Sequence, residues 1–215
     1  MSVLEEFDHS SPFVLYGMKT GNCIRAAMAL EEAELPYVVR HYDPRAPGEG
    51  EVEYRRLNPT GKVPTLIDLS QRDDPFVLTQ SNAIVLYAGS KAPEKLLHAG
   101  DARAQARVLE RFTYFVTDVI VPNHAGFFLK LQGDAVAAKV LSDRSMAAIE
   151  DAERFASAST FIAGDAFSIA DIAAVTIVSA VADELPWDRL PALSRWFSQV
   201  RTRPAFVRST SAFDG

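Results

Sequence analysis

The sequence predicts two kinds of fold in succession: an α/β domain followed by an all-α domain. In the first 90 residues, short runs of β-branched and aromatic residues alternate with helical periodicity, which is typical of α/β folds. After residue 100 the β-type runs give way to alanine-rich segments with apolar residues at helical spacing. We therefore expect an α/β domain at 1–90, a linker at 91–100 and a helical-bundle domain at 101–215.

The predicted elements of the first domain follow the order βαβ–ββα. They are a strand at 13–16, a helix at 22–35, a strand at 37–42, two strands entered at Pro64 and Phe76, and a helix at 81–89. The first two strands are expected to be parallel because a helix connects them. The Pro- and Gly-rich stretch between the two halves predicts a loop with a short helix at 51–57.

Four helices are expected in the second domain. Their apolar markers are Val108, Phe112, Phe115 and Val119, interrupted at Pro122; Val136, Val140, Ile149, Ala152 and Phe155; the run from Ile169 to Ala182; and Leu193, Trp196, Phe197 and Val200. The third helix is apolar around most of its circumference, which indicates a position at the centre of its domain. Ser168 and Asp171 form a capping box at its start.

Composition and charge exclude several classes of function. A net charge of −6, from 22 basic and 28 acidic residues, works against binding nucleic acid or an anionic membrane through a global field. The acidic N-terminus, Met1–Asp8, is unlike a secretion signal and no apolar run approaches spanning length, so we expect a cytoplasmic protein. Cys23 is the only cysteine, and the four histidines are scattered singly, so no disulfide and no metal site is expected.

The most informative motif is the pair of segments around Pro64 and Ser81. Proline cannot donate a hydrogen bond to a strand ladder, so Pro64 must begin a strand or lie at an edge, which leaves the backbone of Val63 free to pair with a ligand. A cis Val63–Pro64 bond would turn that backbone toward a peptide-like ligand. Ser81, at a predicted helix N-terminus, is suited to hold a carboxylate.

These segments, Gly61–Leu66 and Gln80–Tyr87, resemble the glutathione-binding half of the soluble glutathione transferases. The resemblance implies a thioredoxin-like first domain, a cis Val63–Pro64 bond, and glutathione as co-substrate without a metal. It assigns the Val63 backbone to the cysteinyl part of glutathione, Gln80 and Ser81 to its γ-glutamyl end, and Lys62 to its glycyl carboxylate.

The turn after the first strand carries the candidate catalytic residues. Thr20-Gly21-Asn22 resembles the Thr-Pro-Asn of the bacterial nu-class and yeast prion-like transferases, with glycine in place of proline. The resemblance implies that Thr20, helped by Asn22, stabilises the glutathione thiolate. Three alternatives remain open: Thr20 or Asn22 only caps the helix, Cys23 forms a mixed disulfide, or Tyr16 activates the thiol. We expect Arg25 at the surface.

The sequence therefore predicts a glutathione transferase that acts on a small apolar electrophile, and the resemblance implies a homodimer. One alternative is a glutathione-dependent disulfide-bond oxidoreductase, and another is a non-catalytic glutathione-transferase-like binding module. The second-substrate wall is expected from an aromatic-rich stretch: Phe112, Tyr114, Phe115, His124, Phe127 and Phe128.

Overall fold

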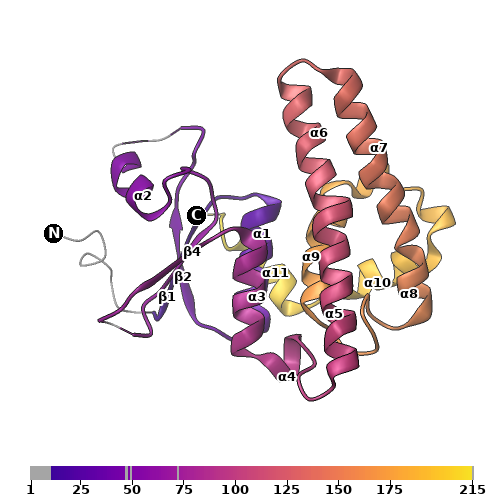
Figure 1. The fold of residues 1–215 in the computed structure, drawn as a ribbon, viewed down its shortest axis with the longest axis horizontal. Helices are drawn as coiled ribbons and strands as arrows, with labels where there is room; N and C mark the ends of the chain where they lie inside the picture. The colour runs from indigo at the N-terminus through magenta and orange to yellow at the C-terminus, as the bar shows by residue number, and fades with distance from the viewer. Residues whose placement is uncertain (1–10, 47, 49, 72, 215) are drawn as a thin grey trace. The chain divides into compact units, whose positions relative to one another are not determined.

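A computed structural model describes residues 11–46, 48, 50–71 and 73–214 (Figure 1). The chain forms two compact units, one built from the described residues up to Lys91 together with those from Pro204 onward, the other from Ala92–Arg203. The last segment was expected in the helical domain but belongs to the first unit, and the expected linker contains a short helix, α4(Pro93–Leu96). The acidic stretch Met1–Asp8 lies outside the described residues.

The first unit contains a four-stranded mixed sheet. Its elements are β1(Phe13–Gly17), α1(Gly21–Glu32), β2(Tyr37–His41), α2(Glu51–Leu57), β3(Thr65–Asp68), β4(Phe76–Thr79), α3(Ser81–Lys91) and α11(Pro204–Ser211). The strand order is β2-β1-β3-β4, with β1 parallel to β2 and β3 antiparallel to both β1 and β4. This arrangement confirms the predicted βαβ–ββα order of a thioredoxin-like domain.

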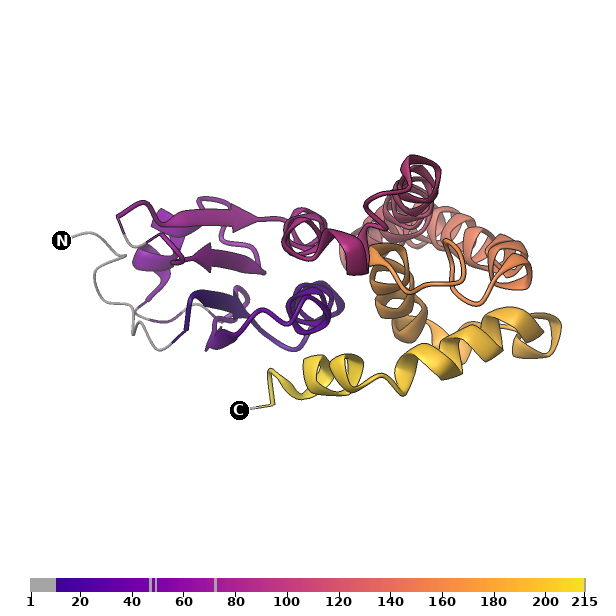
Figure 2. The same cartoon turned by 90° about the horizontal axis from the view of Figure 1, so that it is seen from below.

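Both faces of the sheet are covered by helices. Successive side chains of each strand point to opposite faces, so both faces carry side chains that must be buried. Helices α1 and α3 lie on one face and α2 lies on the other, while α11 lies beside α1 (Figure 2). On the α2 face, Val14 and Ile67 are buried in a small apolar cluster that Leu57 of α2 joins. The ring of Tyr54, also in α2, lies 5.4 Å from the ring of Tyr16 in β1.

The second unit is entirely helical in its described elements. They are α4, α5(Ala102–Tyr114), a π-helical segment η1(Phe115–Ile120), α6(Val121–Leu131), α7(Ala135–Asp151), α8(Glu153–Ala158), α9(Ile169–Ala180), the 3-10 turns η2(Ala182–Glu184) and η3(Trp187–Arg189), and α10(Pro191–Arg201). Helix α9 is buried from Ile169 to Val178, as predicted. The Ser168–Asp171 capping box is present, and Asp171 also accepts a hydrogen bond from Trp196 at 2.8 Å.

Two sequence-based expectations for this unit are wrong. Pro122 does not interrupt the first long helix, because the chain passes from α5 through η1 into α6, and proline is tolerated in the first turn of the new helical segment. Val136 and Val140 do not mark the buried face of α7, since both are exposed. The other predicted markers, Ile149, Ala152 and Phe155, are buried. Within the described part of the chain, no helix is both long and apolar enough to cross a membrane.

Candidate functional site

The register of the sheet brings the predicted site segments to one edge. Thr65, the first residue of β3, is paired with Tyr16 near the end of β1 and with Thr79 at the end of β4. The turn that follows β1, the Val63–Pro64 peptide that precedes β3, and Gln80 after β4 therefore lie at the same end of three adjacent strands. The Val63–Pro64 bond is cis.

Thr20 is the N-cap of α1. Its backbone is extended, and its hydroxyl oxygen accepts a hydrogen bond from the backbone N–H of Cys23 at 3.4 Å. Threonine is a preferred N-cap residue because its oxygen satisfies one of the unpaired N–H groups of the first turn. Capping uses the hydroxyl as an acceptor and does not consume its proton, so the same group can donate to a ligand.

A buried arginine connects this turn to the start of α3. Arg25 is 1% exposed, and its Nη1 donates to Asn22 Oδ1 at 2.8 Å and to Ser81 Oγ at 3.2 Å. Ser81 in turn donates to Asn22 Oδ1 at 3.5 Å. The expectation that Arg25 lies at the surface is wrong, because its position one turn into α1 directs it toward the N-terminus of the neighbouring α3.

This cluster gives the site a positive charge and fixes the orientation of the Asn22 side-chain amide. Burial lowers the pKa of Arg25 to about 10, which still leaves the guanidinium charged at neutral pH. Because Asn22 Oδ1 faces the guanidinium, the Nδ2 group is the end of that amide that can donate elsewhere. A carboxylate near Ser81 would meet a helix N-terminus and a buried cation together.

The segment before β3 is held by a polar network from α2 and its following turn. The carbonyl of Lys62 accepts hydrogen bonds from the Tyr54 hydroxyl and from Asn58 Nδ2, each at 2.6 Å. Thr65 Oγ1 lies 2.8 Å from the same Tyr54 hydroxyl. The Lys62 side chain is exposed, Val63 is half-buried and Pro64 is buried. The backbone around Val63 is thus held in place while the Lys62 ammonium group stays accessible.

Gln80 occupies an unusual backbone conformation. Its φ is 71°, in the left-handed region that residues with a Cβ rarely adopt, and its side chain is exposed. It immediately precedes α3, and its carbonyl accepts the N–H of Ile84 at 3.0 Å. Strained backbone of this kind is concentrated at ligand sites, where the surrounding structure holds it.

The structure does not favour the two residues considered as alternatives for thiol chemistry. Cys23 is 0% exposed, and burial raises the pKa of its thiol against the lowering effect of a hydrogen bond with Thr20. A buried, protonated thiol is a poor nucleophile. Tyr16 lies within β1, and burial raises the pKa of its hydroxyl. Both observations favour packing roles for these side chains.

Only some of the residues expected to form the second-substrate wall are exposed. Phe112 and Phe115 are buried in the core of the helical unit rather than lining an open surface. The Tyr114 hydroxyl donates to the carbonyl of Ala148 at 2.7 Å. Only Phe127 and Phe128, in α6, are exposed. Phe112 and Phe115, in the first half of this stretch, are therefore better interpreted as core residues, as their helical spacing indicates.

In the described part of the chain, no three His, Cys, Asp or Glu side chains lie together in a way that could hold a metal ion. The polar groups at the sheet edge are hydroxyl, amide, guanidinium and ammonium groups. These are suited to an anionic, peptide-like ligand.

Comparison with known proteins shows which family the two halves of the chain resemble. Residues 21–91 match the family model "Glutathione S-transferase, N-terminal domain" and residues 116–204 match "Glutathione S-transferase, C-terminal domain". The disulfide-bond oxidoreductase YfcG of Escherichia coli K12 is 28% identical over 197 residues, covering 89% of this chain and 91% of that protein. The glutathione S-transferase GstB of the same organism is 28% identical over 193 residues, covering 86% and 90%.

A solved structure shares the whole fold. A glutathione transferase family member from Pseudomonas fluorescens Pf-5, crystallised with two glutathione molecules bound, superposes with a TM-score of 0.81 at 21% identity. The superposition covers 98% of each chain.

Proposed function

Because the chain belongs to the glutathione S-transferase family, we propose that it binds glutathione at the sheet edge and activates its thiol for attack on an apolar electrophile. The observation that carries the proposal is the Asn22–Arg25–Ser81 cluster, which joins the turn bearing Thr20 to the N-terminus of α3. One cluster thereby supports both a thiol-activating group and an anion-binding group.

The residues take the following roles in this proposal. Glutathione supplies the nucleophilic sulfur, whose reference pKa near 8.5 must fall for the thiolate to form at neutral pH. The Thr20 hydroxyl, with the Asn22 amide, donates a hydrogen bond to that sulfur. Ser81, Gln80 and the buried Arg25 charge hold the γ-glutamyl carboxylate.

The other end of the ligand is held by the segment before β3. The Val63 backbone pairs with the cysteinyl amide, and Pro64 fixes the entry to the strand. The Lys62 ammonium, which is exposed, pairs with the glycyl carboxylate in this proposal. Each of these groups suits a negatively charged tripeptide, and none of the roles requires a metal.

Glutathione is expected to stabilise the fold. A ligand that binds only the native state adds about 2.7 kcal/mol at 100 times its dissociation constant. Thermal unfolding with and without millimolar glutathione measures this, and an unchanged midpoint would remove the proposal. Gln80→Ala and Ser81→Ala should each reduce the shift, because each leaves part of a charged ligand unpaired. Gln71→Ala, at an exposed position in the β3–β4 turn, is a control that should keep the full shift.

A second candidate function is glutathione-dependent disulfide reduction, favoured by the similarity to YfcG. Side-by-side assays with a chlorodinitrobenzene-type electrophile and a hydroxyethyl disulfide separate the candidates. Turnover of the first supports a transferase, turnover of the second alone supports an oxidoreductase, and turnover of neither supports a binding module. In either active case we expect Cys23→Ala to retain activity, because Cys23 is buried. Loss of disulfide turnover in Cys23→Ala would instead assign that residue a covalent role.

The proposal extends to the assembly and the location of the protein. We propose a homodimer in the cytoplasm, with no nucleic-acid or membrane partner. Molar mass by light scattering at micromolar concentration tests the dimer, and a monomeric mass would contradict it.

A further inference from the structure

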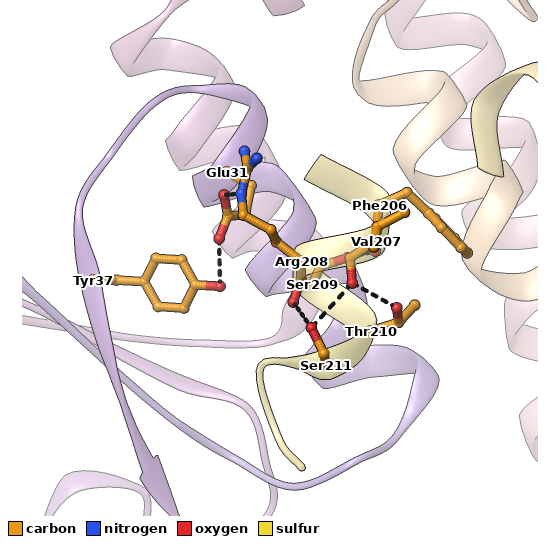
Figure 3. Close-up of polar contacts among 8 residues, drawn as sticks. All are labelled: Glu31, Tyr37, Phe206, Val207, Arg208, Ser209, Thr210 and Ser211. Carbon is orange, nitrogen blue, oxygen red and sulfur yellow. Dashed lines mark hydrogen bonds and ion pairs between the residues drawn. The ribbon is translucent and has the colours of Figure 1, made fainter. Parts of the chain in front are cut away.

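The segment 204–214, here called the strap, runs along α1 in the opposite direction. Arg208 in α11 donates from Nε to Glu31 Oε2 at 2.6 Å, and Glu31 lies near the C-terminal end of α1. Glu31 Oε1 also accepts a hydrogen bond from the Tyr37 hydroxyl at 3.1 Å, as Figure 3 shows. The middle of the strap is thus bound to α1 and is linked through Glu31 to Tyr37 of β2.

The C-terminal end of the strap reaches the turn that carries Thr20. Phe213 is 5% exposed, and a Cβ built on Gly17 would lie 2.8 Å from Phe213 Cε1. The ring therefore lies directly against the backbone at the end of β1, where only glycine leaves room for it. The His41 ring meets it edge-on, with centroids 6.3 Å apart. The next residue, Asp214, forms an ion pair with Lys19.

These contacts hold the turn immediately before the N-cap. A Cβ on Gly17 would also come within 3.0 Å of Cys23 Sγ, so Phe213, Gly17 and Cys23 form one packed layer. The Cys23 backbone N–H donates to the Thr20 hydroxyl. Thr20 is therefore fixed on both sides by residues that touch the strap or its packed layer.

We propose that Phe213, assisted by Asp214, is a positioning residue for thiol activation: it holds the turn 17–20 so that the Thr20 hydroxyl faces the glutathione sulfur. The inference rests on the proposed function, because it assigns the strap a role in a reaction at Thr20. Phe213 carries most of the effect, since its ring is buried, whereas both members of the Lys19–Asp214 pair are about half exposed and an exposed ion pair contributes little.

The test compares Phe213→Ala and Phe213→Leu with Phe206→Ala, which removes a ring of the same size, 8% exposed, from the same strap. Three quantities are measured: the pKa of the bound glutathione thiol, kcat and KM for glutathione, and hydrogen exchange at the Cys23 amide. For Phe213→Ala we expect a thiol pKa raised by about one unit, kcat lowered about three- to fivefold at neutral pH, and a nearly unchanged KM. Exchange at the Cys23 amide should become faster.

The matched variants show whether the effect comes from position or from stability. Phe213→Leu should give intermediate values, and it decides the question alone if Phe213→Ala does not fold. Phe206→Ala should lower the unfolding temperature without moving the thiol pKa or the Cys23 exchange rate. An unchanged thiol pKa in the Phe213 variants, or the same change in Phe206→Ala, would overturn the proposal.

Parallel measurements separate this inference from the proposed function. If the parent protein binds glutathione and Thr20→Ala raises the thiol pKa while Phe213→Ala does not, only the role of the strap fails. If the parent protein does not bind glutathione, the proposed function fails and the role of the strap fails with it.

Discussion

Thr20→Ala is expected to lower turnover between about tenfold and about thirtyfold at neutral pH, because a thiol with a pKa near 8.5 is only about 3% thiolate at pH 7. The pKa of the bound glutathione thiol should rise toward about 8.5, its unperturbed value. Thr20→Ser should retain most activity because the hydroxyl survives, and Asn22→Ala should have a smaller effect than Thr20→Ala. Thiolate absorbance against pH, followed with glutathione bound, measures the shift in each variant.

The control for this variant must account for the lost helix cap. Removing an N-cap costs about 1 kcal/mol, so some loss of stability is expected from Thr20→Ala alone. Asp134 caps α7 in a comparable way, accepting from the Ala137 N–H at 2.9 Å. Asp134→Ala should lose a similar amount of stability and keep the thiol pKa of the parent protein. An unshifted thiol titration in Thr20→Ala would show that Thr20 is only a cap.

Arg25→Met is expected to weaken glutathione binding between about tenfold and a hundredfold, because it removes a buried cation and leaves two polar partners without this donor. Asn22 Oδ1 and Ser81 Oγ both accept hydrogen bonds from Arg25 Nη1. Ser81 Oγ is the buried group that loses a donor, at a cost of about 1–3 kcal/mol, so the unfolding temperature should fall as well. Calorimetric titration, well below that temperature, measures the dissociation constant independently of stability.

Two further variants sharpen the result for Arg25. Arg25→Lys keeps the charge but loses the planar donor fork, so it should bind glutathione with intermediate affinity. Arg56→Met removes an exposed arginine from α2 and should change neither affinity nor stability. A dissociation constant unchanged in Arg25→Met would show that the cluster serves the fold and not the ligand.

The architecture of the first unit could be predicted from the sequence because local signals agree with the tertiary structure. The run at 13–16, the Pro64 strand entry and the Ser81 helix start each predicted the observed element. The buried helix α9 was equally clear, since apolar residues occupy most of its circumference. In each case the hydrophobic period and the boundary residue indicated the same element.

The features that the sequence could not show depend on packing between distant segments. Arg25 resembles an ordinary surface residue until α3 is placed beside α1, since its partner Ser81 lies 56 residues away. Helix α11, which begins at Pro204, was not among the predicted helices, although proline is common at a helix start. The exposed valines of α7 show a further limit of the sequence, because the spacing of apolar residues alone does not tell which face of a helix is buried.

Because Gln80 has a left-handed backbone conformation, we expect selection for stability and selection for glutathione binding to favour different residues at this position. Glycine would adopt a φ of 71° without steric conflict, so a library of position-80 variants selected only for thermal stability should be enriched in glycine and asparagine. A library selected for retention on immobilised glutathione should instead keep glutamine, because neither of the smaller residues has its reach. We therefore expect stability and glutathione binding to favour different residues at the junction of β4 and α3.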